Sequence, residues 1–191
     1  MPTSRMEAFS DGVLAIVITI MVLELRIPQG EGWSTLRSVA PVFFTYALSF
    51  VYLGIYWNNH HHMLHAAERT SGAVLWANLH LLFWLSLVPV TTAWLGESRF
   101  ATVPTVVYGI VLLLAAVAYY VLKVAILAAA GPSSKLAEAF GNDLKGKISP
   151  VVYVVGIAVA FASPFVAVAL YIAVAMMWLV PDRRIEKMIE S

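Results

Sequence analysis

The chain contains no cysteine among its 191 residues, which excludes disulfides, thiol nucleophiles and metal sites built from cysteine. Charge is also scarce, since Asp, Glu, Lys and Arg make up 12% of the chain, about half their share in a soluble domain. The net charge of +1 provides no basic field that would attract nucleic acid. Hydrophobic side chains are abundant instead, at 61% of the residues and a mean hydropathy of +0.82. The composition predicts a polytopic membrane protein with no room for a separate soluble domain.

Six apolar segments follow one another along the chain, and a helix needs about 20 such residues to cross ~30 Å of hydrocarbon. We therefore expect an all-α membrane protein that forms one six-helix transmembrane domain over residues 1–191. The last two segments come from one long apolar stretch that is interrupted at Ser163-Pro164, where a single kinked helix is the alternative. The expected helices cover about 9–25, 39–57, 74–95, 103–130, 148–162 and 164–180.

The positions of Lys and Arg indicate how these helices are oriented. Nine of the twelve Lys and Arg residues fall on the side that carries both termini, and three fall on the other side. Because cytoplasmic loops are enriched in Lys and Arg, we expect both termini in the cytoplasm and the protein in the inner (plasma) membrane. Between the fourth and fifth helices, residues 131–140 are expected to form a short amphipathic helix at the membrane surface.

The first apolar segment carries Arg5, Ser10 and Asp11 at its entrance. An Asp near the centre of a membrane helix costs roughly 2.5–3.5 kcal/mol even on lenient insertion scales, so such a residue usually faces protein or water. A cleaved signal peptide is the alternative, but Asp11 precedes the uncharged core, Glu24 follows it, and no small-x-small cleavage site is nearby. We therefore expect a permanent helix that lines a bundle.

Helical periodicity separates this segment into two faces. At 100° per residue, Asp11 lies almost opposite an apolar stripe. Ordinary helix packing explains such a stripe most simply, and a pore axis is the alternative. Thr19 lies at its edge, where the hydroxyl can face a water-filled lumen or donate to the Ala15 carbonyl. The stripe consists of Phe9, Val13, Ile16, Ile20 and Leu23.

The same segment contains a specific pattern. It reads Arg5-x-x-x-Phe9-Ser10-Asp11, then Gly12-Val13, Ala15-Ile16-x-Ile18-Thr19 and Leu23-Glu24-Leu25. This pattern closely resembles the first helix of the transmembrane protein 175 potassium channel family, which includes the lysosomal potassium channel of animals and smaller prokaryotic relatives. Further likeness comes from Trp57-Asn-Asn-His60-His61 at the end of the second helix, and from Asn78 and Pro89 in the third.

The resemblance implies a channel whose first helices surround a central axis, without a re-entrant filter loop. Because this chain carries one six-helix unit and no internal repeat, the resemblance implies a homotetramer in the lipid bilayer. Aligned on the pattern, Ile16 takes the position of the family's main hydrophobic constriction, and Thr19 takes a polar position implicated in selectivity. Ile20 and Leu23 follow Ile16 one and two turns further.

The resemblance also implies a polar network that holds the first helix against the second and third. On the first helix, Arg5, Ser10 and Asp11 belong to it, next to Phe9 of the motif. Because Asp11 faces away from the apolar stripe, we expect it to affect assembly or gating more than ion selectivity. The candidate partners on the other two helices are His60, His61 and Asn78.

The chain has no Thr-Val-Gly-Tyr-Gly segment, which excludes the carbonyl filter of the usual potassium channels. We expect a weakly K⁺-selective leak channel in which an apolar constriction at Ile16 is both gate and filter, and Thr19 hydroxyls replace lost water. The expected ligand is the permeant K⁺ alone, without a cofactor. A secondary transporter is the alternative function, but it usually shows an inverted repeat and ionisable groups near the midplane, and we find neither.

The segment His60-His61-His62-Met-Leu-His65 is the one candidate for a metal-dependent enzyme, because His61 and His65 lie one helical turn apart. No carboxylate lies between these two and cysteine is absent, so we expect neither an enzyme nor a metal site. A role of the histidines in pH-dependent gating stays open. Lys123, in the cytoplasmic half of the fourth helix, can extend its ammonium group to the membrane surface.

Overall fold

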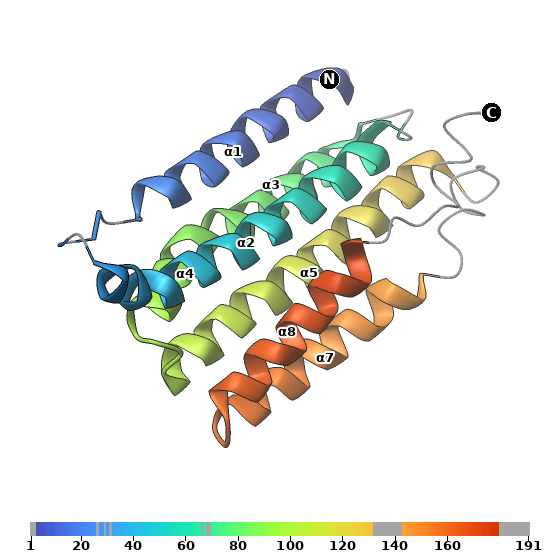
Figure 1. The fold of residues 1–191 in the computed structure, drawn as a ribbon. Helices are drawn as coiled ribbons and strands as arrows, with labels where there is room; N and C mark the ends of the chain where they lie inside the picture. The colour runs from blue at the N-terminus through green and yellow to red at the C-terminus, as the bar shows by residue number, and fades with distance from the viewer. Residues whose placement is uncertain are drawn as a thin grey trace.

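The computed structural model describes residues 3–25, 27–28, 30, 32–65, 67, 70–131 and 143–179. These residues form helices and turns without a strand, which confirms the expected all-α class (Figure 1). The helices are α1 (Thr3–Leu23), α2 (Trp33–His65), α3 (Gly72–Ser86), α4 (Val88–Glu97), α5 (Thr102–Ala130), α7 (Leu144–Ala160) and α8 (Pro164–Leu179). In the described part, α1, α2, α5 and the consecutive pair α3–α4 are each long and apolar enough to cross a membrane. These are the helices of a multi-pass membrane protein.

Some expectations concern residues that the structure does not describe. The expected surface helix at 131–140 lies outside the described residues from 132 onward, and so does the last residue of the expected sixth helix, Val180. The expected orientation depends on twelve Lys and Arg residues, and half of them are also outside the described residues. These are Arg26, Arg69, Lys135, Arg183, Arg184 and Lys187.

The third span consists of two helices, whereas one helix was expected over 74–95. α3 and α4 meet at Leu87. Pro89 explains the break, because it has no N–H to donate to the Leu85 carbonyl and its ring would collide with that carbonyl. The Leu87 N–H bonds instead to the Trp84 carbonyl at 3.2 Å, which tightens the last turn of α3.

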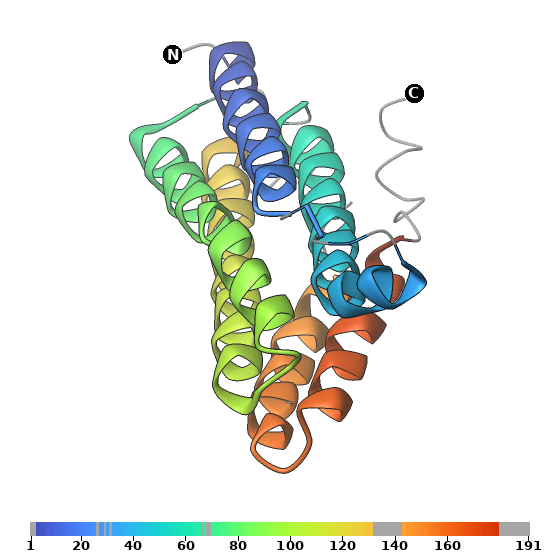
Figure 2. The same cartoon turned by 60° about the vertical axis from the view of Figure 1, so that its left-hand side comes forward.

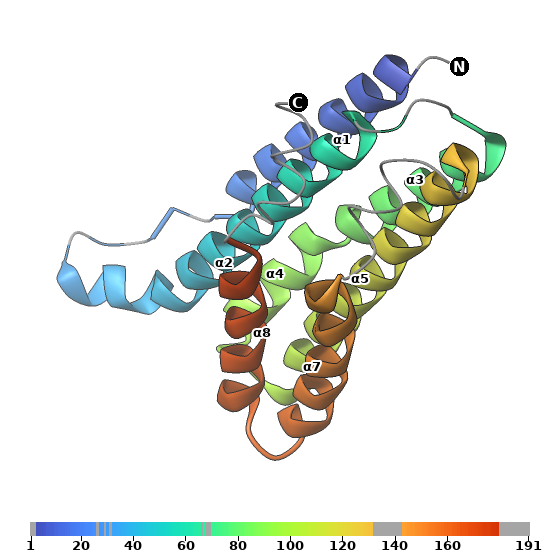
Figure 3. The same cartoon turned by 90° about the vertical axis from the view of Figure 1, so that its right-hand side faces the viewer.

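α2 has 33 residues and extends beyond the expected range of 39–57 at both ends. The expected range counted only apolar residues, but polar residues continue a helix as long as its backbone bonds are kept. Pro41 lies inside α2 and removes one of these bonds. The first turns of α2 accordingly run at an angle to the rest of the helix (Figure 3).

The chain reverses direction between α7 and α8, which lie side by side as an antiparallel hairpin (Figure 3). The N–H groups of Ala162 and Ser163 both donate to the Val159 carbonyl, at 2.9 and 2.8 Å, and so close the turn. Pro164 then begins α8, where its missing N–H costs nothing. The apolar stretch is therefore two short helices of 17 and 16 residues, not one kinked helix.

α5 runs through the middle of the bundle, with α1 along one edge and the α7–α8 hairpin along the opposite edge (Figures 1 and 2). α1 packs against α2, α3 and α4, while α5 packs against α3, α4 and α7. One apolar core lies beneath α1 and includes Leu14, Leu53 and Leu81. A second core around Tyr108 and Tyr171 joins α2, α5, α7 and α8. This arrangement leaves one side of α1 uncovered within a single chain.

Candidate functional site

α1 has one buried face and one exposed face. Its buried face packs on the core beneath it, through Met6, Ser10, Leu14, Val17 and Met21. On the opposite face, Ile16 is 58% exposed and Leu23 is 80% exposed. Phe9, Thr19 and Ile20 are exposed on the same side. An apolar face that its own subunit leaves uncovered must meet lipid, another copy of the chain or a lumen.

The exposed face differs from the expected stripe at one position. Val13 was expected on the stripe, but it is partly buried and packs against the core. Gly12 is exposed, and a Cβ atom there would have no neighbour within 4 Å among the described residues. Periodicity placed Val13 wrongly because core-facing and outward-facing residues of a membrane helix are both apolar, so hydrophobicity does not distinguish them.

The Thr19 hydroxyl donates to the Ile16 carbonyl at 2.9 Å. Sequence reasoning considered the Ala15 carbonyl for this bond, so the acceptor is one residue further along the helix. Because the only hydrogen of the hydroxyl is used by the backbone, the oxygen keeps lone pairs that face outward as acceptors. An exposed acceptor of this kind suits a cation better than an anion.

A buried hydrogen-bonded triplet connects α1 to α3 and α2. The Ser10 hydroxyl donates to the Met6 carbonyl at 2.8 Å and accepts from Asn78 Nδ2 at 2.9 Å. Asn78 Oδ1 lies 2.7 Å from His60 Nε2. Because Asn78 Oδ1 can only accept, we assign the proton of His60 to Nε2. The Nδ1 atom of His60 is buried and has no partner among the described residues.

Two further contacts join α1 to α2 nearer the surface. Trp57 Nε1 donates to Asp11 Oδ1 at 3.0 Å, and His61 Nδ1 lies 2.7 Å from Glu7 Oε1. The two acidic residues are one turn apart on α1, and Trp57 and His61 are one turn apart on α2. Sequence reasoning missed Glu7 and Trp57 as partners, although this matched spacing on two antiparallel helices was a usable signal.

The structure therefore divides the expected network. Ser10, Asn78 and His60 come together, while Asp11 bonds to Trp57 and not to a histidine. Arg5 is exposed and forms no ion pair with another described residue. Phe9 is on the exposed face, away from these bonds.

The histidine segment at the end of α2 forms ring contacts. His61 stacks on His65 with ring centroids 6.0 Å apart and meets His62 edge-on at 5.6 Å. In the described part of the chain, no three His, Asp or Glu side chains are grouped so that they could hold a metal ion.

Comparison with known proteins relates this architecture to ion channels. A family model described as the endosomal/lysosomal potassium channel TMEM175 matches residues 5–89. A potassium channel of Chryseobacterium sp. (strain P1-3) is 52% identical over 191 residues, which are 100% of both chains. A potassium channel of Streptomyces collinus is 36% identical over 128 residues, 63% of this chain and 62% of that protein.

A solved structure is also similar. The crystal structure of a lysosomal potassium-selective channel TMEM175 homolog from Chamaesiphon minutus superposes with a TM-score of 0.81 and 31% sequence identity. The match covers 93% of this chain and 96% of that one.

Proposed function

The chain belongs to the TMEM175 potassium channel family, and from that premise we propose that four copies form a cation channel lined by their α1 helices. The channel conducts K⁺ in weak preference to Na⁺. Its constriction is the ring of Ile16 side chains, followed by Ile20 and Leu23 towards the other end of α1. Both termini face the cytoplasm, and the protein resides in the inner (plasma) membrane.

The observation that carries this proposal is the division of α1 into a buried and an exposed face. Ile16 and Leu23 are on the exposed face, and the buried face is fully used for packing inside the subunit. Four such faces around an axis form an apolar passage. A passage of this kind stays dry when it is narrow and conducts when the helices move apart.

Thr19 supports the choice of a cation. Its oxygen is an acceptor on the exposed face, because its hydrogen is donated to the Ile16 carbonyl. Four such oxygens partly replace the water that a cation loses on entering the constriction, and they offer nothing to an anion. A ring of hydroxyls coordinates ions more loosely than a ring of carbonyls, and the Ile16 side chains do not coordinate them at all. The preference for K⁺ over Na⁺ is therefore moderate.

The polar contacts of α1 position this passage. Among the described residues, every side-chain bond from α1 to another helix comes from Glu7, Ser10 or Asp11. The part from Ile16 to Leu23 is held by apolar packing alone. Such packing permits small shifts more readily than hydrogen bonds do, so the constriction moves while the beginning of α1 stays fixed.

Ion permeation through the purified protein in planar bilayers tests the proposal. With K⁺ on one side and Na⁺ on the other, the reversal potential is expected to indicate a modest preference for K⁺. A potential at zero would refute the K⁺ preference, and one that follows the anion gradient would refute a cation channel. Currents without any gradient of a coupling ion separate a channel from a transporter.

Substitution of the constriction tests the role of α1. Ile16→Asn is expected to wet the passage, raise the conductance and reduce the difference between K⁺ and Na⁺. Val154→Asn is the matched control, since Val154 is 53% exposed and belongs to α7, which lies along the opposite edge of the bundle from α1 (Figure 1). Equal effects of the two variants would show that Ile16 does not line the conduction path.

A further inference from the structure

A cavity lies between α2, α5, α7 and α8, on the far side of α2 from the exposed face of α1. Its enclosed volume is about 40 Å³, and it is open at its mouth. Among the described residues that line the cavity, Asp143 is the only charged one. Half of the lining residues are aromatic, namely Tyr52, Tyr56, Tyr119, Tyr120, Tyr153 and Trp178.

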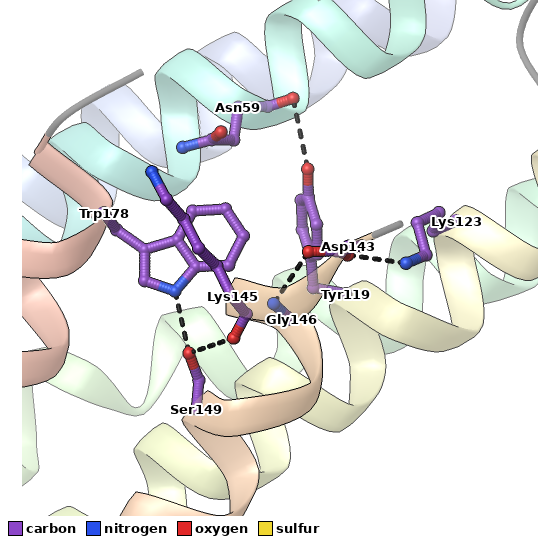
Figure 4. Close-up of polar contacts among 8 residues, drawn as sticks. All are labelled: Asn59, Tyr119, Lys123, Asp143, Lys145, Gly146, Ser149 and Trp178. Carbon is purple, nitrogen blue, oxygen red and sulfur yellow. Dashed lines mark hydrogen bonds and ion pairs between the residues drawn. The ribbon is translucent and has the colours of Figure 1, made fainter. Parts of the chain in front are cut away.

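Asp143 is held firmly at the beginning of α7. Its Oδ1 accepts from the Gly146 N–H at 2.7 Å, and its Oδ2 lies 2.6 Å from Lys123 Nζ of α5 (Figure 4). Lys123 is therefore buried and paired with Asp143. The ammonium group of Lys123 also lies 5.0 Å from the ring centroid of Tyr120. A carboxylate and a tyrosine face thus already hold one alkylammonium group at the edge of this cavity.

The rest of the wall is fixed by bonds between helices. Trp178 Nε1 donates to Ser149 Oγ at 2.8 Å, which sets the indole of α8 against α7 (Figure 4). The Tyr119 hydroxyl points to the Asn59 carbonyl at 3.4 Å, which joins α5 to α2. Asn59 Nδ2 donates to the Ile55 carbonyl, so its side-chain oxygen remains an acceptor. These bonds between helices hold the aromatic wall in place.

We infer that this cavity binds a small organic ammonium ion. Aromatic faces attract cations through their negative quadrupole, and quaternary ammonium groups are the ligands that aromatic cages recognise best. Asp143 is the charged residue of the described wall, and its charge is balanced by the Lys123 ammonium group 2.6 Å away, so the aromatic faces are what favours a cation there. The site is separate from the α1 face.

Choline and its uncharged carbon isostere, 3,3-dimethylbutan-1-ol, test the role of charge. Both are titrated by calorimetry into the purified protein in nanodiscs made of phosphatidylglycerol and phosphatidylethanolamine. Choline is expected to bind saturably, and the isostere to bind at least tenfold more weakly. Equal binding of the two compounds, or no saturable choline signal, would overturn the inference.

Substitutions in the wall locate the site. Tyr56→Leu removes one aromatic face and should weaken choline binding about 5- to 30-fold, the range of one desolvated cation–π contact. Tyr46→Leu, on the same helix but outside the cavity, is the matched control and should bind as the wild type does. Unchanged binding by a well-folded Tyr56→Leu protein would overturn the inference. If Tyr56→Leu does not fold, Tyr120→Leu replaces it, because Tyr120 also lines the cavity and is 50% exposed, and unchanged choline affinity there overturns the inference equally.

Two further arms complete the design. Phosphatidylcholine added to the nanodiscs abolishes the choline signal if lipid headgroups fill the site, and leaves it intact if a free ion does. Either result supports an ammonium site and identifies its source.

The Ile16→Asn variant should bind choline normally, because it alters only the proposed pore. Loss of choline binding in that variant would place the bound choline in the pore and overturn the inference, whatever the channel activity.

Discussion

Among the polar contacts of α1, the triplet of Ser10, Asn78 and His60 is expected to hold α1 most firmly against α2 and α3. Asn78→Leu removes the amide with little change in volume. His60 is 1% exposed, so its Nε2–H is then buried without an acceptor, which costs about 1–3 kcal/mol. Ser10 loses only an incoming bond, because its own hydrogen is still donated to the Met6 carbonyl.

The double variant Asn78→Leu/His60→Phe separates this explanation from a general loss of packing. Replacing both partners with apolar groups leaves no unpaired donor and is nearly neutral. Thermal unfolding in detergent measures both variants, and for a domain of this size 1–3 kcal/mol lowers Tm by roughly 2–12 °C. The single variant should show that decrease and the double variant should recover most of it. A double variant as unstable as the single one would refute the reasoning.

Three other predictions follow from particular contacts. Asp11→Ala and Trp57→Phe should each reduce the fraction of assembled protein to a similar degree, because they break the same bond. The double variant should reduce this fraction no further. An Asp11→Ala protein that assembles normally but loses its K⁺ preference would contradict this prediction. Thr19→Val should lower the K⁺ over Na⁺ preference in reversal-potential measurements while Thr19→Ser retains it, and the opposite order would exclude the hydroxyl oxygen as a ligand. Gly109→Ala should destabilise the protein by about 1–3 kcal/mol, because its Cβ would lie close to the Tyr171 hydroxyl oxygen; an unchanged Tm would show that Tyr171 moves aside freely.

The sequence predicted the all-α class because its apolar segments are long enough to cross a membrane as helices. It could also have predicted the break at Leu87, since Pro89 removes a backbone donor two residues later. It did not predict that Val13 turns inward and Gly12 outward. In a membrane helix both faces are apolar, and only the positions of the neighbouring helices decide which face is buried.

Polar partners were harder to predict than helices. Of the side chains that the resemblance implies, the structure brings Ser10, Asn78 and His60 together, but the resemblance did not assign Trp57 to Asp11. The pair Lys123–Asp143 joins two helices across a long connection, and nothing in the local sequence relates them. Hydrophobicity therefore predicts where helices occur, whereas hydrogen-bond partners depend on how the helices are arranged.

Single-cysteine accessibility along α1 tests most directly whether this helix lines the passage. The chain contains no cysteine, so each introduced thiol is the only target for a charged thiol reagent applied during current recording. Modification should alter the current at the exposed positions Gly12, Ile16, Thr19 and Leu23, and not at the buried positions Leu14 and Val17. A current that responds at the buried positions, or at none of the six, would contradict a pore formed by the exposed face of α1.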